Sequence, residues 1–455
     1  MIILKQCYTY LLLVLVTGSA ATLSPKAKES LFPTLPPNLV PNNVNDSSIE
    51  EINQREGVAD YLFQGDINLS EEQLDRIEKS PTASGAPRAK RQVGTAAVPW
   101  RDNILYYFDA SLTMYLGLIW QNYACISARK RNMVQIALNY IRDRTCLQFV
   151  ESSTATHRIR VFSGSSCYSS VGMIGREQQL SLGDGCTLIG IVAHEFMHAL
   201  GVWHMQMRDD RDNFVIIDLS SVPANLHGNF IKLNSADVIS YNPYEYGSTM
   251  HYNAVAFSST NSYTILPWDT PYTRTIGSRT ITFYDIKTIN DHYKCHDQCG
   301  AGSAVCLNGG EPNPRNCAIC NCPAGYGGAT CNERPAGCGE ALVATALWKV
   351  KQFTFGNAAI TTHRDTYREC NHRVQAPAGK QIQIRITYMK TVPCSHGCHI
   401  NSIEPKVRSN TRATNPRICC SDLLNEVFTS VLNPTPIISY NRYLTSTFTF
   451  HYRFI

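Results

Sequence analysis

The chain has 455 residues, which is enough for two or more domains. Its hydrophobic fraction of 44% and charged fraction of 17% suit a globular protein. The formal net charge of +5 is mild and comes without clusters of Lys and Arg, so we expect no nucleic-acid partner.

The N-terminus has the pattern of a secretory signal. Lys5 supplies a positive charge, the run from Tyr10 to Val16 is apolar, and residues 18–21 are small, as a cleavage site requires. The apolar run is well short of the ~20 residues that span a bilayer, and no later stretch is long enough. We therefore expect a signal peptide at 1–21, no membrane span, and a secreted, extracellular protein.

Residues 22–91 have the character of a propeptide. Their first part is rich in proline and polar residues, which predicts a weakly structured start. The segment ends in Arg88-Ala89-Lys90-Arg91, a dibasic site that suits cleavage after Arg91 by a furin-like convertase; a basic surface loop is the alternative. N-x-S/T sequons at Asn45 and Asn68 predict glycosylation in this region.

Three periodic stretches follow. Met133, Ile136 and Tyr140 lie at i, i+3 and i+7, which predicts an amphipathic helix. Residues 157–162 partly alternate and end near a glycine, which indicates a strand. Residues 187–200 are mostly apolar, and we expect a buried helix that carries the most informative motif of the chain.

This motif is His-Glu-Phe-Met-His-Ala-Leu-Gly-Val-Trp-His, from His194 to His204. His194 and His198 are four positions apart, so on a helix they share one face and can bind one zinc ion. Glu195 stands beside them, where it can act as a general base on water. Gly201 can adopt a positive φ and end the helix, which returns His204 to the metal. A buried helix that carries histidines by chance is the alternative, but the extended pattern makes chance matches rare.

The region resembles a known peptidase family. The extended motif is that of metzincin peptidases, and Ser-Thr-Met-His-Tyr at 248–252 resembles their Met-turn. The continuation from His204 to Asp212 resembles the astacins in particular. The resemblance implies a zinc metalloendopeptidase with one Zn²⁺, and an α+β metzincin domain over 92–297 with a twisted, mostly parallel sheet and an active-site helix. It also implies that Met250 forms the apolar floor of the site. Tyr252 would ligate zinc or stabilise the oxyanion; a plain packing residue is the alternative.

The resemblance reaches into the propeptide and also meets a departure. Phe63-Gln64-Gly65-Asp66-Ile67 is similar to the astacin inhibitory motif, which implies that Asp66 ligates zinc in the zymogen. A Gly-Asp turn is the alternative. Astacins have a glutamate after the third histidine that contacts the new N-terminus, and this chain has Met205 there. A thioether cannot pair with an ammonium, so we expect that Gln92 is not fixed by such an ion pair.

Eighteen cysteines, one of them in the signal peptide, indicate disulfides formed in an oxidising compartment. Residues 298–332 are similar to an EGF-like domain through the ending C-x-C-x5-G-x2-C. A zinc knuckle at Cys317 and Cys320 is the weaker alternative, because no second C-x-x-C pair stands at ribbon spacing. The two resemblances imply these disulfides: Cys146–Cys295, Cys167–Cys186, Cys299–Cys317, Cys306–Cys320 and Cys322–Cys331.

The C-terminal region, 338–455, resembles a CUB domain, which is a β-sandwich. Alternation around Ile382, Ile384 and Ile386 predicts one of its strands. Cys125 is left over, either buried and free or cross-linked to another chain. The resemblance implies Cys338–Cys370 and two bonds of open pairing among Cys394, Cys398, Cys419 and Cys420.

The leading hypothesis is a secreted zinc endopeptidase that is made as a zymogen and hydrolyses extracellular proteins. Matrix or cuticle components are the substrates that the domain order implies. A non-enzymatic extracellular binding protein on a peptidase scaffold is the alternative, although no histidine of the motif and no glutamate is lost. Many astacins prefer an acidic residue after the scissile bond; Arg274 and Arg279 follow the Met-turn, but the sequence places neither in a pocket.

Overall fold

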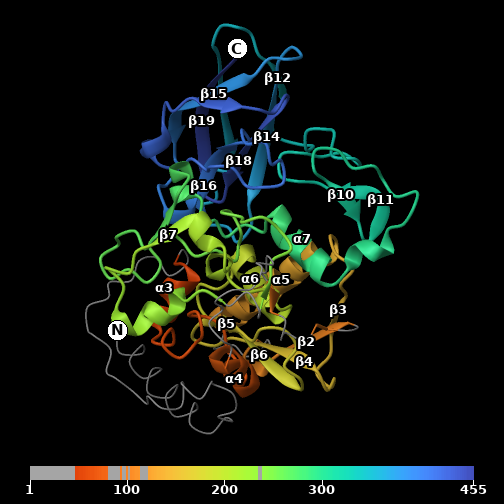
Figure 1. The fold of residues 1–455 in the computed structure, drawn as a ribbon, viewed down its shortest axis with the longest axis vertical. Helices are drawn as coiled ribbons and strands as arrows, with labels where there is room; N and C mark the ends of the chain where they lie inside the picture. The colour runs from red at the N-terminus through yellow and green to blue at the C-terminus, as the bar shows by residue number, and fades with distance from the viewer. Residues whose placement is uncertain (1–46, 80–92, 95–98, 101–102, 113–120, 234–237) are drawn as a thin grey trace.

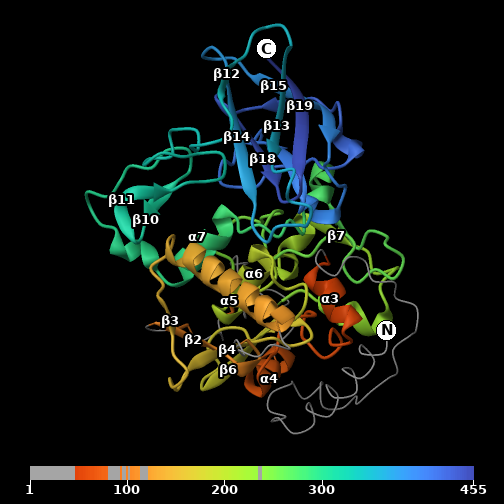
Figure 2. The same cartoon turned by 180° about the vertical axis from the view of Figure 1, so that it is seen from behind.

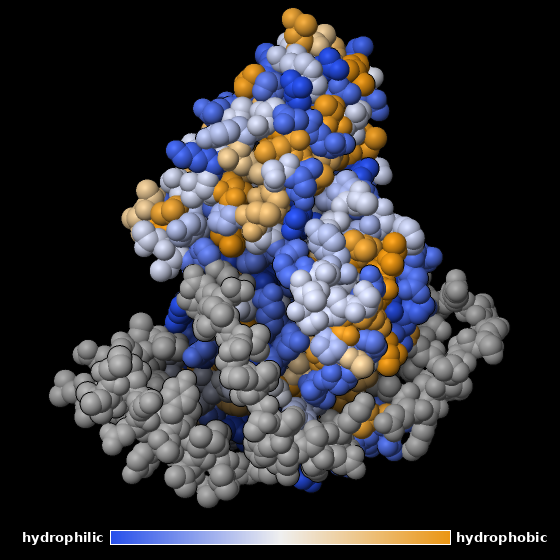
Figure 3. Space-filling model, turned by 90° about the vertical axis from the view of Figure 1, so that its left-hand side faces the viewer, coloured by the Kyte–Doolittle hydropathy of each residue, from blue (hydrophilic) through white to orange (hydrophobic). Residues whose placement is uncertain are grey.

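The chain forms an N-terminal lobe, a small turn-rich module and a C-terminal β-sandwich that stacks on the lobe (Figures 1 and 2). Across the described part of the chain, no helix combines the length and the apolar character that crossing a membrane requires. On the face in Figure 3, hydrophilic residues separate the hydrophobic ones over the sandwich. The structure is a computed structural model that describes residues 47–79, 93–94, 99–100, 103–112, 121–233 and 238–455.

A five-stranded sheet forms one layer of the lobe, in the order β3-β2-β4-β6-β5. All neighbouring strands run parallel except β5, which pairs antiparallel with β6 at one edge. Ile159 and Val161 alternate with more exposed residues in β4 and are fully buried, so this face packs on the helices. The strands are β2 (Ile104–Phe108), β3 (Phe149–Glu151), β4 (Arg158–Phe162), β5 (Cys167–Ser169) and β6 (Glu177–Leu182).

Two helices cover the sheet, with α5 in front in Figure 2. α5 (Gln121–Arg142) contains the predicted amphipathic stretch, and Met133 is buried in the core. α6 (Ile189–Ala199) is buried at every position after its first residue. Gly190 permits a close approach, because a Cβ there would overlap the carbonyl oxygen of Arg279. The helix that carries the histidines is therefore enclosed between the sheet and a later loop.

The second half of the lobe is irregular, and its final helix supports the Met-turn. Asp285, in the capping box of α7, accepts hydrogen bonds from Ser248 Oγ (2.5 Å) and Thr249 N (3.1 Å). The elements are β1 (Val93–Gly94), η1 (Ala110–Leu112), η2 (Met205–Met207), η3 (Arg211–Asn213), β7 (Val215–Ile217), η4 (Ala224–Phe230), β8 (Val238–Ile239), β9 (Ile265–Pro267), η5 (Thr270–Arg274), α7 (Phe283–His292) and η6 (Cys295–Gln298).

The segment 47–79, here called the N-terminal segment, lies against the lobe. It contains α3 (Ile49–Arg55) and α4 (Glu71–Lys79). Between them, Ile67 forms a parallel bridge with Ser169 of β5. Ser169 N donates to the Asp66 carbonyl oxygen (3.1 Å), so the segment extends the edge of the sheet.

The two C-terminal parts are built from antiparallel ladders. The small module contains β10 and β11, and the sandwich stacks the sheets β12-β14-β18-β16 and β13-β19-β15-β17, in which only β12 and β14 pair in parallel. Ile382, Ile384 and Ile386 are fully buried between the sheets, which confirms the predicted alternation. The strands are β10 (Glu311–Asn313), β11 (Asn316–Asn321), β12 (Ala341–Val343), β13 (Lys349–Gly356), β14 (Arg368–Gln375), β15 (Ile382–Lys390), β16 (Asn401–Pro405), β17 (Phe428–Ser430), β18 (Thr435–Asn441) and β19 (Thr445–Phe454), with the short turns η7 (His396–Cys398) and η8 (Ser421–Leu423).

Disulfides cross-link all three parts internally. The sandwich joins Cys394 to Cys420 and Cys398 to Cys419, a choice that the sequence left open. The side chain of Cys125 lies outside the described residues. The other bonds are Cys146–Cys295, Cys167–Cys186, Cys299–Cys317, Cys306–Cys320, Cys322–Cys331 and Cys338–Cys370.

Candidate metal centre

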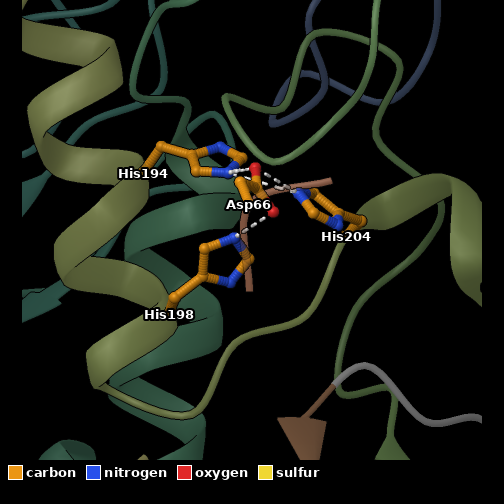
Figure 4. Close-up of side chains that lie close together, drawn as sticks. All are labelled: Asp66, His194, His198 and His204. Carbon is orange, nitrogen blue, oxygen red and sulfur yellow. Dashed lines mark hydrogen bonds and ion pairs between the residues drawn. The ribbon is translucent and has the colours of Figure 1, made fainter. Parts of the chain in front are cut away.

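Three histidines converge on one point in the lobe (Figure 4). His194 and His198 project from α6, and Gly201, with φ of +99°, ends the helix and turns the chain back. His204 then faces the same point from the following loop, with 3.3 Å between its Nε2 and that of His194. All three side chains are buried.

The outer nitrogen of each ring is held by an oxygen. The Nδ1 of His194 contacts the carbonyl oxygen of Thr249 (2.8 Å), and the Nδ1 of His198 contacts that of Val202 (2.7 Å). A carbonyl oxygen can only accept, so each Nδ1 must carry the proton. The lone pair is therefore on Nε2, and both lone pairs point inward, as metal ligation requires.

His204 differs because its outer contact comes from the N-terminal segment. Its Nδ1 lies 2.9 Å from Oε1 of Gln64. The carbonyl oxygen of Gln64 also accepts a hydrogen bond from the hydroxyl of Tyr252. One residue of the segment thus engages a histidine and the tyrosine of the Met-turn together.

Asp66 fills the space between the histidines. Its Oδ2 lies 3.1 Å from the Nε2 of both His194 and His204, and its Oδ1 lies 3.5 Å from that of His198. Gly65 makes this approach possible: its φ is +75°, and a Cβ there would lie 2.6 Å from the ring of Phe257.

These four groups fit one zinc ion. Ligands about 2.0–2.1 Å from a tetrahedral zinc lie roughly 3.3–3.4 Å apart. The 3.3 Å between His194 and His204 and the 3.1 Å contacts of Asp66 match that spacing. Moreover, Nε2 of His198 is buried without a hydrogen-bond partner among the described residues, as expected of a nitrogen that ligates a metal.

The carboxylate and the imidazoles of the centre differ in their protonation. Burial lowers the pKa of His198, and lowers that of His204 to about 4, so both rings are neutral near pH 7. Burial would raise the pKa of Asp66, but the adjacent histidines outweigh it and hold the pKa well below its usual value. An ionised carboxylate therefore faces the neutral rings of His198 and His204. Burial would lower the pKa of His194, but its hydrogen bond to Asp66 and the charge of that carboxylate outweigh burial and raise it. A carboxylate with imidazole nitrogens is a favourable donor set for a dication.

Glu195 lies beside the histidines and is fully buried. Neither of its carboxylate oxygens has a hydrogen-bond partner among the described residues. Burial, and then the charge of Asp66, raises its pKa well above the usual value. A buried carboxyl group of this kind is suited to exchange a proton with a molecule that enters the centre.

The Met-turn lies under the centre. Met250 is fully buried, and its carbonyl oxygen accepts from Met205 N (2.9 Å). The ring of Tyr252 lies 4.8 Å from that of His204, so its hydroxyl group is close to the metal ligands. Met205 itself is 1% exposed. Gln92 lies outside the described residues, so the expectation about its ion pair stays a prediction.

Arg279 is a basic residue beside the metal centre. The sequence alone did not place it there. Arg279 lines a small cavity together with Glu50 of the N-terminal segment, His194 and Tyr252. Burial lowers the pKa of Arg279, and the charges of nearby glutamates, Glu50 among them, oppose that shift. No motif marks this arginine, because it reaches the centre only through the fold of its loop.

Other predicted residues lie elsewhere. Arg274 pairs with Asp422 of the sandwich at 2.9 Å and does not line the cavity. Asn68 is 4% exposed where the segment packs on the lobe, and glycosylation at this sequon stays a prediction. Asn45 and Arg91 lie outside the described residues.

His251 gives the Met-turn a defined pH response. Burial lowers its pKa to about 4, and its ring nitrogens contact the Tyr252 carbonyl and Tyr244 hydroxyl oxygens (both 2.7 Å). The unfolded chain therefore binds the extra proton between about pH 6.5 and pH 4, and stability is lost as the pH falls through that window, by up to roughly 3 kcal/mol. His251→Gln should lessen this loss in denaturant unfolding at pH 7 and pH 4.5, whereas the exposed His157→Gln should not; equal slopes in all three proteins would contradict the assignment.

The chain is similar to known peptidases. Residues 99–294 match the family model described as Astacin, a peptidase family. Zinc metalloproteinase nas-32 of Caenorhabditis elegans is 44% identical over 411 residues, which are 89% of this chain but only 60% of that protein. Zinc metalloproteinase nas-17 of the same nematode is 36% identical over 421 residues, 92% of each chain. A solved hatching enzyme, the zinc-protease high choriolytic enzyme 1 of Oryzias latipes, is 30% identical and covers 43% of this chain and 94% of its own, with a TM-score of 0.37.

Proposed function

This chain belongs to the astacin family of peptidases, and we propose that it is a secreted zinc endopeptidase that is synthesised as a latent precursor. The convergence of three inward-facing histidine nitrogens on the carboxylate of Asp66 carries the proposal. His194, His198 and His204 are the zinc ligands of the mature enzyme, and Asp66 is the fourth ligand of the latent one.

Each remaining group at the centre has a role in peptide hydrolysis. When bound, zinc supplies Lewis-acid polarisation of the scissile carbonyl group and of water. Glu195 accepts a proton from the water and transfers it to the leaving amine. The hydroxyl of Tyr252, freed from the carbonyl oxygen of Gln64, donates a hydrogen bond to the oxyanion. Met250 supplies the apolar floor.

Latency follows from the contacts of the N-terminal segment. Asp66 takes the position that water needs, and Gln64 engages both His204 and Tyr252. A convertase that cleaves after Arg91 would separate residues 22–91 from the peptidase domain at 92–297. The segment is then held only by non-covalent contacts and can leave, which exposes the centre to water and substrate.

The C-terminal modules support an extracellular role. We assign 298–332 as an EGF-like domain, in keeping with its three disulfides. We assign 338–455 as a CUB domain, in keeping with its two-sheet sandwich. The many disulfides favour an oxidising compartment. Extracellular proteins, including matrix or cuticle components, are the proposed substrates.

A chelation experiment tests the proposal. Full-length protein, processed after Arg91, should bind about one zinc ion and cleave an unfolded protein substrate. A chelator should abolish cleavage and added zinc should restore it. If the folded, zinc-bound and processed protein did not cleave any protein substrate, the non-enzymatic alternative would be favoured instead.

Arg279 leads to a specificity prediction. In the latent chain Glu50 lies in the same cavity, so a carboxylate of the N-terminal segment occupies the space beside His194 and Tyr252. We propose that an acidic substrate residue takes this place after the scissile bond. Arg279→Gln should lower kcat/KM for acidic peptides by about 10–100-fold, with little effect on matched neutral peptides.

Arg274→Gln is the matched control for that experiment. It removes the same charge from the same loop region, but its partner is Asp422 on the sandwich. Cleavage of a peptide library by both variants separates the two arginines. The assignment of the pocket would be wrong if Arg274→Gln reduced the acidic preference and Arg279→Gln did not.

A further inference from the structure

The β-sandwich touches the lobe directly behind the metal centre. Figures 1 and 2 show it stacked on the region of α6 and α7. Two residues make the critical contacts: Asp365, in the connection between β13 and β14, and Thr414, in the connection between β16 and β17. The first reaches the start of the histidine helix, and the second reaches the chain just before the Met-turn.

Asp365 supplies a cap that α6 lacks. The N-cap residue Leu188 offers no side-chain hydrogen bond to the first turn. Instead, Ile189 N donates to the carbonyl oxygen of Asp365 (3.0 Å). The Asp365 carboxylate also places negative charge at the helix N-terminus, where the helix dipole favours it. His194 follows Ile189 by five positions, so this cap lies only about 7.5 Å along the helix axis from the first ligand.

The Asp365 carboxylate is fixed by the lobe in return. Its two oxygens accept hydrogen bonds from Nε and Nη2 of Arg129 on α5, at 2.6 and 2.7 Å. Oδ1 also lies 3.1 Å from the hydroxyl oxygen of Thr187, just before α6. These two parallel hydrogen bonds from Arg129 fix the position of Asp365, so its carbonyl oxygen stays within reach of Ile189 N at the start of α6.

Thr414 approaches from the other side. A Cβ on Gly247 would overlap atoms of the Thr414 side chain, so only glycine fits there. Thr414 N donates to the carboxylate of Glu245 (3.1 and 3.3 Å), which also accepts from Gly247 N (2.8 Å). This buried carboxylate thus links the sandwich to Glu245 and Gly247, which stand three positions and one position before Ser248.

The contacts of Asp365 and Thr414 both bear on the position of His194. The carbonyl oxygen of Thr249, one residue after Ser248, is the acceptor for Nδ1 of His194. Thr249 Oγ1 also donates to the carbonyl oxygen of Gly190, in the first turn of α6 (2.9 Å). The start of α6, which contacts Asp365, is therefore hydrogen-bonded to the Met-turn, which follows the residues that contact Thr414. Both elements set the position of the His194 ring.

We propose that the sandwich is a structural part of the metal centre, with Asp365 and Thr414 as positioning residues for His194. The inference rests on the proposed function for its metal, but it concerns metal geometry and affinity rather than the reaction. The partner that these residues recognise is the lobe of the same chain.

The interface also contains contacts that reach neither α6 nor the Met-turn. Arg408 of the sandwich pairs with Asp269 of the lobe at 2.7 Å, and both side chains are largely exposed. Such a surface pair adds little stability. Asp269→Ala is therefore a matched control: it removes one carboxylate from the same interface without altering the contacts behind His194.

The test compares Asp365→Ala, Asp365→Asn and Asp269→Ala in the full chain, processed after Arg91 and checked for folding by circular dichroism. The measurements are zinc affinity by chelator competition, the visible spectrum of the Co²⁺-substituted protein, and kcat and KM. Asp365→Ala should weaken zinc binding about tenfold, shift the Co²⁺ bands and lower kcat more than KM changes. Asp365→Asn should lie between this variant and the parent, and Asp269→Ala should match the parent.

Unchanged zinc affinity and Co²⁺ bands in a folded Asp365→Ala protein would overturn the inference. So would equal effects of Asp365→Ala and Asp269→Ala. If Asp365→Ala does not fold, Asp365→Asn and Thr414→Gly decide the question by the same metal measurements. A parent protein that binds zinc but cleaves nothing would refute the proposed function, while the metal comparison would still decide this inference.

Discussion

Replacement of Glu195 by Gln is expected to lower kcat of the processed protein by about 10²–10⁴-fold, the usual contribution of general acid–base catalysis. The amide has nearly the same shape but cannot accept the proton. Glu195 is fully buried and neither of its oxygens has a hydrogen-bond partner among the described residues, so the substitution removes no hydrogen bond there. Zinc content should stay near one ion per chain, because the histidines keep their contacts.

The control for this variant is Glu151→Gln, which changes a carboxylate on the exposed strand β3. Steady-state kinetics with one peptide substrate and metal analysis of the same samples compare the two proteins. If Glu195→Gln kept full activity, the assignment of the base would be wrong. If it lost its zinc, Glu195 would have to be regarded as part of the metal-binding set.

Replacement of Asp66 by Ala is expected to make the uncleaved precursor active. The carboxylate is 1% exposed and contacts all three histidines, so its loss removes a buried charged interaction of about 3 kcal/mol or more. Activity of the precursor should then rise on the order of 10²-fold. The assay uses a small peptide substrate, and mass spectrometry confirms that the chain remains uncut at Arg91.

Asp60→Ala provides the comparison within the same segment. Asp60 accepts hydrogen bonds from Asn225 Nδ2 at 3.0 Å, away from the metal centre. This variant should remain latent, because Asp66 and Gln64 keep their places. A latent Asp66→Ala precursor, or an Asp60→Ala precursor that is equally active, would contradict the role given to Asp66.

Local rules made the central motif predictable. A spacing of four places two histidines on one helix face, and only a residue that tolerates positive φ can turn the chain directly after that helix. His194, His198 and Gly201 satisfy these rules in the structure. The alternation in β15 likewise predicted its buried face, because the sheet period is strict.

Contacts between distant segments were not predictable in the same way. No role for Gln64 was predicted from the sequence, because its contact with His204 depends on how the N-terminal segment enters the centre. Arg279 and Asp365 carry no motif, and only the tertiary fold brings them to the cavity and to the start of α6. The burial of Asn68 was not predictable either, because a sequon carries no information about exposure.

An anomalous difference map at the zinc edge, from crystals of the full-length, zinc-loaded chain, tests whether Asp66 and the three histidines hold one metal ion. We expect one peak per chain, about 2.0–2.2 Å from Nε2 of His194, His198 and His204 and from a carboxylate oxygen of Asp66. A peak elsewhere, or a peak among the histidines with Asp66 turned away, would contradict the proposed latent metal centre.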